Sequence, residues 1–201
     1  NGGGIYADQS DLDIDNSTIT NNQAGRDGGG IGVPATSPGL SLTIHNSIVA
    51  GNTDSGAAPD FLGTGVLSDA AAVQFSLIGN NTGTTLAESQ TADPITGNII
   101  GDPNLGGVID PLLDPLADNG GPTETHLLLE SSPAIDAGDP DFEAAAFSPP
   151  VILDQRGLPR IVGSRIDMGS VDVVGDIVID WENPAEIVFG TALGPAQLNA
   201  T

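Results

Sequence analysis

The stretch that decides the fold reads IDNSTITNN at residues 14–22, returns as IHNSIVAGN at residues 44–52, and appears a third time, more weakly, as VQFSLIGNN at residues 73–81. A second element, GGGI, precedes the first two copies at residues 2–5 and 28–31. The longer copies are offset by 30 and then 29 residues. A short strand-and-turn unit that recurs at such a period is typical of a solenoid, in which similar coils stack to bury a common core.

Apolar and polar residues alternate before each copy, as in a half-buried strand. Residues 11–15 read DLDID and residues 41–45 read SLTIH in the same phase, while residues 70–74 read AAAVQ. The repeat period aligns these residues into inward-pointing ladders, with neighbouring strands about 4.8 Å apart. The predicted ladders are Leu12–Leu42–Ala71, Ile14–Ile44–Val73 and Ile19–Val49–Ile78.

Polar residues mark the corners of the predicted coils. Asn16, Asn46 and Phe75, each followed by Ser, stand where the chain must turn, and Phe75 departs from the Asn of the other two corners. At the end of the next strand, Asn can adopt the left-handed conformation and bond its stacked equivalents. This structural Asn ladder is predicted at Asn22, Asn52 and Asn81. The glycine runs are expected where backbone passes tightly.

Short strands and tight turns in coils of some 26 to 30 residues favour an all-β, right-handed parallel β-helix. A leucine-rich horseshoe is disfavoured because its Leu-x-x-Leu-x-Leu frame does not occur. We assign residues 1–116 to β-helix coils, with a fourth, irregular coil around residues 95–103 that follows an insertion at residues 83–94. A stack of only three or four coils would leave an open edge of unpaired backbone. Further coils are therefore expected upstream of residue 1.

The charge balance excludes several classes of partner. The chain carries 27 acidic residues, four arginines and no lysine, for a net charge of -23 and a pI near 4.1. Nucleic acids and anionic membrane surfaces both require clustered cations. No apolar run approaches the roughly 20 residues of a membrane span, so no membrane insertion is expected in this segment. The lack of cysteine excludes disulfides, thiolate metal sites and cysteine catalysis.

The second half carries more specific motifs: DNGGPTETHLLL at residues 118–129, SPAIDAGD at 132–139, DQRGLPR at 154–160 and DMG at 167–169. Together they closely resemble the ending of bacterial surface β-helix proteins of the choice-of-anchor Q family, which are similar to polymorphic outer-membrane-protein repeats. The resemblance covers roughly residues 2–172. It implies an exported bacterial β-helix protein, extracellular or on the cell surface, without established catalytic residues. Residues 117–173 are accordingly assigned to a segment that closes the helix.

Three of the four arginines, Arg156, Arg160 and Arg165, fall within ten residues of this segment. Cations so concentrated in an acidic chain are expected to form forked bonds with carboxylates or strand-end carbonyls. The predicted carboxylate partners are Asp136, Asp154 and Asp167. We interpret the group as a structural clamp at the end of the solenoid; a site for an anion or a sugar acid is the alternative.

Residues 174–201 form a third region, predicted as a linker followed by an incomplete immunoglobulin-like β-sandwich. Residues 177–181 alternate as a strand, and residues 183–201 look like the beginning of a bacterial immunoglobulin-like repeat. A complete sandwich needs roughly 80 to 100 residues. The chain is therefore expected to belong to a longer, multidomain protein.

The strand at residues 11–15 projects Asp11, Asp13 and Asp15 from one face at intervals of about 7 Å. A solvated face is the favoured interpretation, and a calcium or glycan contact is the alternative, so calcium is the one cofactor considered. Only Asp15 has a partner of opposite charge on the next coil, His45. The other histidine, His126, is expected to be structural. With 27 acids, pairs of carboxylates occur by chance, so no catalytic residue is assigned.

These features predict a non-enzymatic, exported surface protein that acts as a spacer or adhesin-like module. Its repetitive β-helix face would be presented to glycans or to other cell-surface proteins. One alternative is a carbohydrate-active enzyme, resembling a polysaccharide lyase or hydrolase, whose catalytic coils lie upstream. The other is a calcium-stabilised component of an extracellular matrix, which a chelator-dependent melting shift would reveal.

Overall fold

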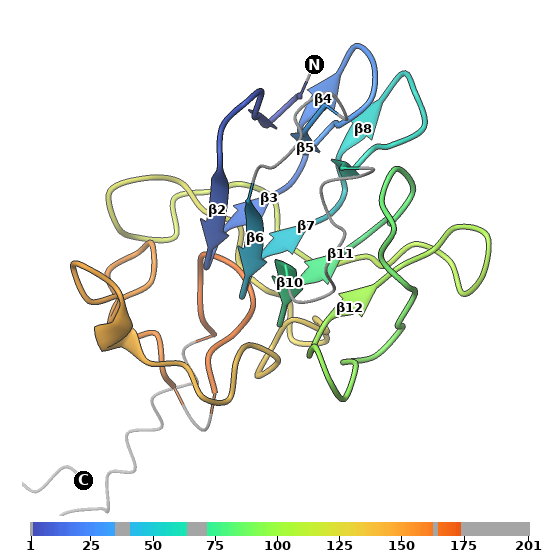
Figure 1. Ribbon diagram of the computed structural model, residues 1–201. Helices are drawn as coiled ribbons and strands as arrows, with labels where there is room; N and C mark the ends of the chain where they lie inside the picture. Colours follow the sequence, from blue (N-terminus) through green and yellow to red (C-terminus); the bar gives the residue numbers. More distant parts are fainter. Residues whose placement is uncertain (1, 35–40, 64–71, 163–164, 174–201) are drawn as a thin grey trace, which may run out of the picture.

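The computed structural model describes residues 2–34, 41–63, 72–162 and 165–173 (Figure 1). This part of the chain is nearly all β, as predicted, and its helical structure is confined to short 3-10 turns such as η2 (Ala144–Ala146). The strands are β1 (Ile5–Tyr6), β2 (Leu12–Asp15), β3 (Thr18–Ile19), β4 (Gln23–Ala24), β5 (Ile31–Gly32), β6 (Leu42–His45), β7 (Ile48–Val49), β8 (Thr53–Asp54), β9 (Phe61–Leu62), β10 (Val73–Gln74), β11 (Leu77–Ile78) and β12 (Ile99–Ile100).

The strands form four parallel sheets, and each sheet takes one strand from each successive repeat. The strand orders are β1-β5-β9, β2-β6-β10, β3-β7-β11-β12 and β4-β8. The register confirms the predicted ladders Ile14–Ile44–Val73 and Ile19–Val49–Ile78, and it pairs Leu12 with Leu42. Ala71 lies outside the described residues. β12 pairs with β11, so the fourth repeat lies where it was predicted.

The first hydrophobic core lies between these sheets. Its side chains come from equivalent positions of successive repeats, which follows from the alternation of each short strand. Almost all of them are aliphatic, and the buried ring of Phe61 is the exception among the core residues described. The buried members are Ala7, Ile14, Ile19, Ile31, Val33, Leu42, Ile44, Val49, Phe61, Val73, Ile78 and Ile100.

The corners keep one conformation in three repeats even though their residue types differ. Asn16, Asn46 and Phe75 have φ values of 47°, 48° and 47°, in the left-handed region. A bulky residue is rarely found there. The Phe75 ring packs beside the His45 ring, with centroids 5.8 Å apart, and a Cβ on Gly97 would overlap it. We infer that these contacts offset the conformational cost at Phe75.

A ladder of serine hydroxyls runs through the same corners. The backbone N–H of Ser17 donates to Ser47 Oγ and that of Ser47 donates to Ser76 Oγ, both at 3.1 Å, and the Ser76 N–H donates to Asn98 Oδ1 at 3.0 Å. Each serine hydroxyl also donates to the carbonyl two residues before it. The repeated Asn-Ser motif therefore connects successive repeats through side chains as well as through the sheet.

The glycine runs lie where backbones of successive repeats meet. A Cβ on Gly3 would overlap the Gly29 carbonyl, and one on Gly29 would overlap the carbonyls of Thr53 and Pro59. Gly28 has a φ of +78°. Close approach thus requires glycine at Gly3 and Gly29, and the left-handed conformation requires it at Gly28.

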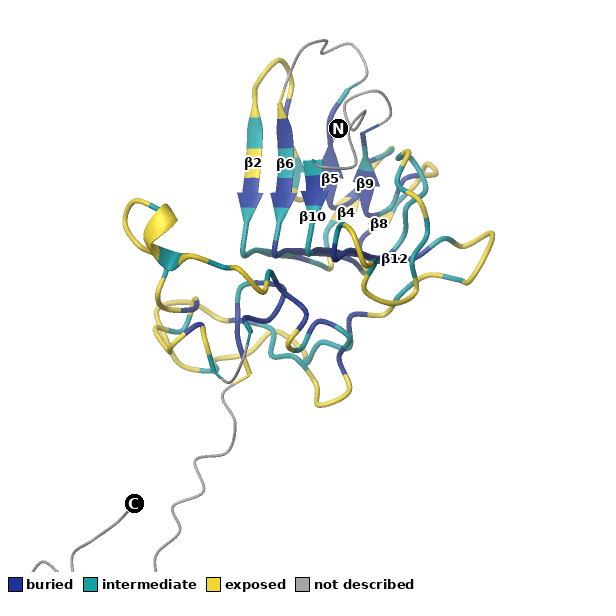
Figure 2. Cartoon of the chain, turned by 60° about the horizontal axis from the view of Figure 1, so that its bottom comes forward, coloured by how far each residue is buried: buried dark blue, intermediate teal, exposed yellow. Residues whose placement is uncertain are grey.

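The sheet β3-β7-β11-β12 is buried on both faces. Val49, Ile78 and Ile100 point into the first core. Their neighbours Ile48, Leu77 and Ile99 point to the opposite side, into a second core that contains Ala134, Ala137 and Met168. Figure 2 shows the C-terminal half lying beneath this sheet. In parallel strands that are buried on both faces, adjacent residues are all apolar, and the residues of β7, β11 and β12 follow this pattern.

This arrangement differs from the cap expected at the end of the stack. The described C-terminal segment returns along the flank to the first two repeats, where the Gly169 N–H donates to Asn46 O at 2.8 Å and the Ser170 N–H donates to Thr18 Oγ1 at 3.0 Å. The reason is the outward apolar row on the sheet, which needs cover along its length. The predicted immunoglobulin-like region, residues 174–201, lies outside the described residues. Within the described ranges, no helix is long and apolar enough to span a membrane.

Candidate functional site

The predicted Asn ladder exists in part. Asn22 donates through its backbone N–H and its Nδ2 to Asn52 Oδ1, at 3.0 and 3.1 Å. The third position is taken by Asp60, whose Oδ1 accepts the Asn52 backbone N–H at 2.9 Å and Asn52 Nδ2 at 3.0 Å. Asn81 instead donates to Leu86 O at 2.9 Å. The expected third Asn is therefore displaced, because the loop between β8 and β9 inserts a carboxyl group.

The left-handed conformation also lies one residue earlier than expected. Asn21 and Gly51 have φ values of 58° and 71°, whereas Asn22, Asn52 and Asn81 are not among the described residues with positive φ. Because Asn21 and Gly51 make the turn, the side chains that follow them are free to bond along the stack. The ladder is a hydrogen-bonding device rather than a set of turn residues.

Asp60 is the most deeply buried carboxyl group along this ladder, with 3% of its surface exposed. Burial raises its pKa to about 6, although hydrogen bonds from Asn52 and from the Asn80 backbone oppose the shift. The neighbouring Asp54 charge raises the pKa further. No sequence motif marked Asp60, since it lies in a loop outside the repeated stretch.

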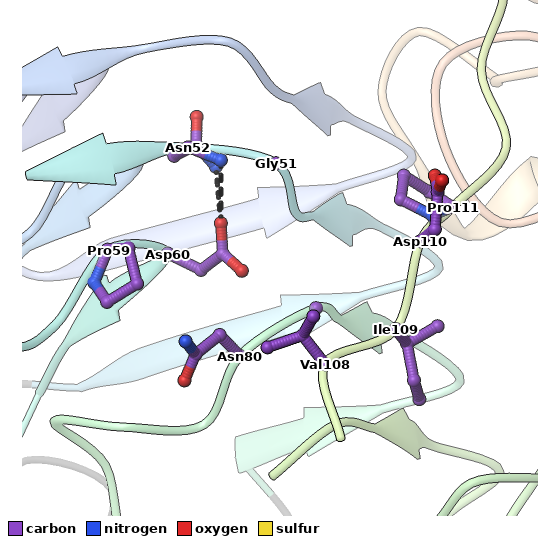
Figure 3. A pocket seen from close by; sticks show the side chains of 10 residues that line it. Gly51, Asn52, Pro59, Asp60, Asn80, Val108, Ile109, Asp110 and Pro111 are labelled. Atoms are coloured by element: carbon purple, nitrogen blue, oxygen red, sulfur yellow. Dashed lines mark hydrogen bonds between the residues drawn. The ribbon is translucent and has the colours of Figure 1, made fainter. Parts of the chain in front are cut away.

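Asp60 lines one part of a lateral groove formed by two adjoining hollows of about 390 and 370 Å³. The hollows share Gly51, Asp110 and Pro111. One wall consists of the corner positions of three successive repeats, and the other is the segment 108–115, as Figure 3 shows for the first hollow. The remaining lining residues are Thr20, Asn21, Asn52, Pro59, Asp60, Gly79, Asn80, Val108, Ile109, Leu113, Asp114, Pro115 and His126.

The lateral groove is acidic. It contains the carboxyl groups of Asp60, Asp110 and Asp114, and none of its lining residues is Lys or Arg. His126 Nδ1 lies 2.6 Å from Asp114 O. A carbonyl oxygen can only accept, so Nδ1 carries the hydrogen. His126 thus makes the structural bond expected of it and also lines the groove.

Two of the three clustered arginines bind carboxylates. Arg156 donates through Nε and Nη2 to Asp154 Oδ2, at 2.9 and 2.7 Å, and also to Asp172 O. Arg160 is 1% exposed and donates to Asp172 Oδ2 at 2.9 Å. Its other amino group reaches Gly169 O and, at 3.2 Å, Asn16 Oδ1 in the first repeat. Arg160 therefore joins the C-terminal segment to the stack.

The remaining predicted pairings differ. Arg165 donates to the carbonyls of Ala137 and Gly138. Asp167 Oδ1 accepts the Asp136 backbone N–H at 2.7 Å, and its Oδ2 accepts the Val173 N–H. Neither Asp136 nor Asp167 makes a direct bond to an arginine among the bonds described. Asp172, which lies outside the recognised motifs, takes that role because the chain folds back beside Arg160.

Burial is the main influence on the charged groups of this cluster. It raises the pKa of Asp172 to about 6 and that of Asp167 above its ordinary value, and it lowers the pKa of Arg160. A guanidinium group stays protonated across the accessible pH range. We therefore expect the Arg160–Asp172 pair to be charged at neutral pH.

The three candidate calcium ligands contact the next repeat instead of converging. Asp11 Oδ1 accepts the Ser41 N–H at 2.8 Å, and Asp13 Oδ1 accepts the Thr43 hydroxyl. Asp15 lies 3.9 Å from His45 Nδ1; burial and the Asp13 charge raise its pKa, and His45 opposes that rise. Over the described residues, no group of three or more His, Asp or Glu side chains is arranged to hold a metal ion.

Comparison with protein-family models, curated proteins and solved structures finds no match to this chain. The resemblance to the choice-of-anchor Q family accordingly remains a hypothesis from sequence motifs.

Replacing Arg160 tests the clamp. Arg160→Gln is expected to lower the free energy of unfolding by about 3–5 kcal/mol, because it leaves the Asp172 carboxylate buried without its partner. The matched control is Arg26→Gln at an exposed position, expected to change stability by less than about 0.5 kcal/mol. Urea unfolding of both variants measures the difference. Equal effects would show that Arg160 has no special role.

Asp60 gives a second test, through pH. Its folded pKa of about 6 lies above the ordinary aspartate pKa of 3.8, so the folded state binds the proton more tightly than the unfolded state. Protonated Asp60 therefore contributes up to about 3 kcal/mol to the free energy of unfolding. This contribution is complete below pH 4 and is lost as the pH rises through 6. Asp60→Asn should remove this part of the pH dependence, measured as the wild-type-minus-variant difference in unfolding free energy. A difference that stays constant from pH 4 to 7 would refute the assignment.

Proposed function

We propose that this chain belongs to a non-enzymatic, exported bacterial surface protein related to the choice-of-anchor Q family. In this proposal the stacked repeats form a right-handed parallel β-helix that acts as a stiff spacer with an adhesin-like lateral surface. The observation that carries the proposal is the in-register stacking of equivalent residues through four parallel sheets.

The hydrogen bonds between repeats support the spacer role. Ile48 donates to Ser17 O at 2.8 Å, Leu77 to Ser47 O at 2.9 Å and Ile99 to Ser76 O at 2.9 Å. The serine ladder runs parallel to these backbone bonds. Such a stack lengthens by adding repeats, each of which contacts only its neighbours, and it thereby holds a distal part away from its anchor.

The surface properties support an adhesin-like role. A net charge of -23 opposes self-association and keeps such a stack dispersed. The lateral groove offers a concave surface that crosses several repeats. Glycans and other cell-surface proteins are both candidate partners of this surface.

One observation favours a second candidate, a carbohydrate-active enzyme. A buried carboxyl group with a raised pKa, such as Asp60, is the kind of group that acts as a general acid in glycoside hydrolysis. However, two donors from Asn52 hold its Oδ1 as part of the ladder. An enzyme of this kind would release reducing ends from a polysaccharide and would lose that activity in Asp60→Asn.

Display on intact cells tests the proposed function. An antibody raised against the exposed segment 102–108 should label intact bacteria that produce the complete protein, whereas a cytoplasmic control protein should be labelled only after lysis. Bacteria lacking the gene should adhere less to the surface they colonise. Labelling that requires lysis would refute the surface role, and sugar release that depends on Asp60 would favour the enzyme.

A further inference from the structure

We propose that the lateral groove binds an extended, basic peptide segment of a partner protein. This inference rests on the proposed adhesin-like function and specifies the partner class and the site. It concerns the surface formed by the strand-end corners of three repeats and the facing segment 108–115.

The shape of the groove favours a long occupant. Thr20 and Asn21, then Gly51, then Gly79 and Asn80 stand at equivalent corners of successive repeats. Stacked strands lie about 4.8 Å apart, so the three corners span about 10 Å, which is the length of about three residues of an extended chain. The shared lining residues Gly51, Asp110 and Pro111 join the two hollows into one path.

The lining chemistry favours lysine or arginine side chains. Val108, which is 61% exposed, Pro111 and Pro115 provide apolar surface beside the carboxylates of Asp110 and Asp114. A long cationic side chain can lay its methylene stem on such a surface while its charged head reaches a carboxylate. In the wall formed by segment 108–115, Asp110 and Asp114 stand four residues apart and each is followed by a proline, so the wall offers two carboxylates beside apolar surface.

The buried Asp60 gives the groove a fixed acceptor. Its Oδ1 is held by Asn52, so the carboxyl group cannot rotate freely. Its Oδ2 lies 2.8 Å from the place that a Cβ on Gly79 would take, on the side of the groove wall. The Asn80 backbone also hydrogen-bonds this carboxyl group, and Figure 3 shows it between the side chains of Asn52 and Asn80.

A basic peptide is favoured over a neutral oligosaccharide for two reasons. The groove lining contains no aromatic side chain other than the His126 ring, so it lacks the platform on which sugar rings usually stack. The net charge of -23 also steers cations toward the molecule. Because that long-range attraction acts on every polycation, the contribution of the groove must be separated by a control of equal charge.

The test measures binding of a short synthetic peptide in which lysine alternates with alanine, by fluorescence anisotropy with the full chain. The groove variant is Asp110→Asn with Asp114→Asn. The control is Asp118→Asn with Asp141→Asn, two exposed positions outside the groove whose replacement changes the net charge equally. We expect about tenfold weaker binding for the groove variant and less than about twofold for the control. Equal losses would overturn the proposal, because they would show general attraction to the acidic surface.

NMR shifts and oligosaccharide binding distinguish occupation of the groove from a loss of stability in the variants. In the wild-type chain, the amide NMR signals of Gly51, Gly79 and Asn80 should shift on peptide addition, whatever the stability of the variants. A peptide with glutamine in place of lysine should not shift them. Tighter binding of cellohexaose, lost in the groove variant, would identify a glycan site instead. If the peptide does not bind in the groove but the antibody still labels intact bacteria, only the groove proposal is refuted. If the antibody labels bacteria only after lysis, the proposed surface function is refuted.

Discussion

The two-sided burial of the β3-β7-β11-β12 sheet is the interaction on which the rest of the structure depends. Ile48, Leu77 and Ile99 face the second core while their neighbours face the first. Each large apolar side chain that is fully buried contributes about 1.5–3 kcal/mol relative to exposure. The repeats therefore require a cover on their flank, and the C-terminal half supplies it with Ala134, Ala137 and Met168.

That cover explains where the charged groups lie. The segment that forms it has few strand pairings of its own among the described residues, and isolated antiparallel bridges such as Leu113–Leu128 take their place. Buried arginines and aspartates instead satisfy its backbone and link it to the stack, as Arg160 does through Asn16 Oδ1. The same return of the chain places segment 108–115 beside the repeat corners and so creates the lateral groove.

The sequence predicted those features that depend on periodicity. Ladders such as Ile14–Ile44–Val73 follow from side chains recurring at a fixed offset, and local pairs such as Asp154–Arg156 follow from short spacing. The apolar pairs Ile48-Val49 and Leu77-Ile78 also carried the signal for a second core, since both members are apolar. The predicted ladders include only Val49 and Ile78 of these pairs, so the second core is not among the sequence predictions.

Other features depend on the path of the chain and could not be read from local pattern. Asp172 meets Arg160 because of a turn that no motif encodes. Asp60 enters the Asn ladder from a loop outside the repeat. The groove needs two walls distant in sequence, so neither wall alone indicated it. Its corner residues were recognised from the sequence as structural, and their second role appears only when the facing segment is in place.

Native-state hydrogen exchange tests the central claim most directly, because it measures how strongly the cover is coupled to the sheet. The amides of Leu77 and Ile99 bond within the stack, while those of Met168 and Gly169 bond to Ala134 O and Asn46 O in and beneath the cover. If the sheet and its cover form one cooperative unit, all four amides exchange only through global unfolding, with the same free energy. Exchange of Met168 and Gly169 at a free energy several kcal/mol below that of Leu77 and Ile99 would contradict the account.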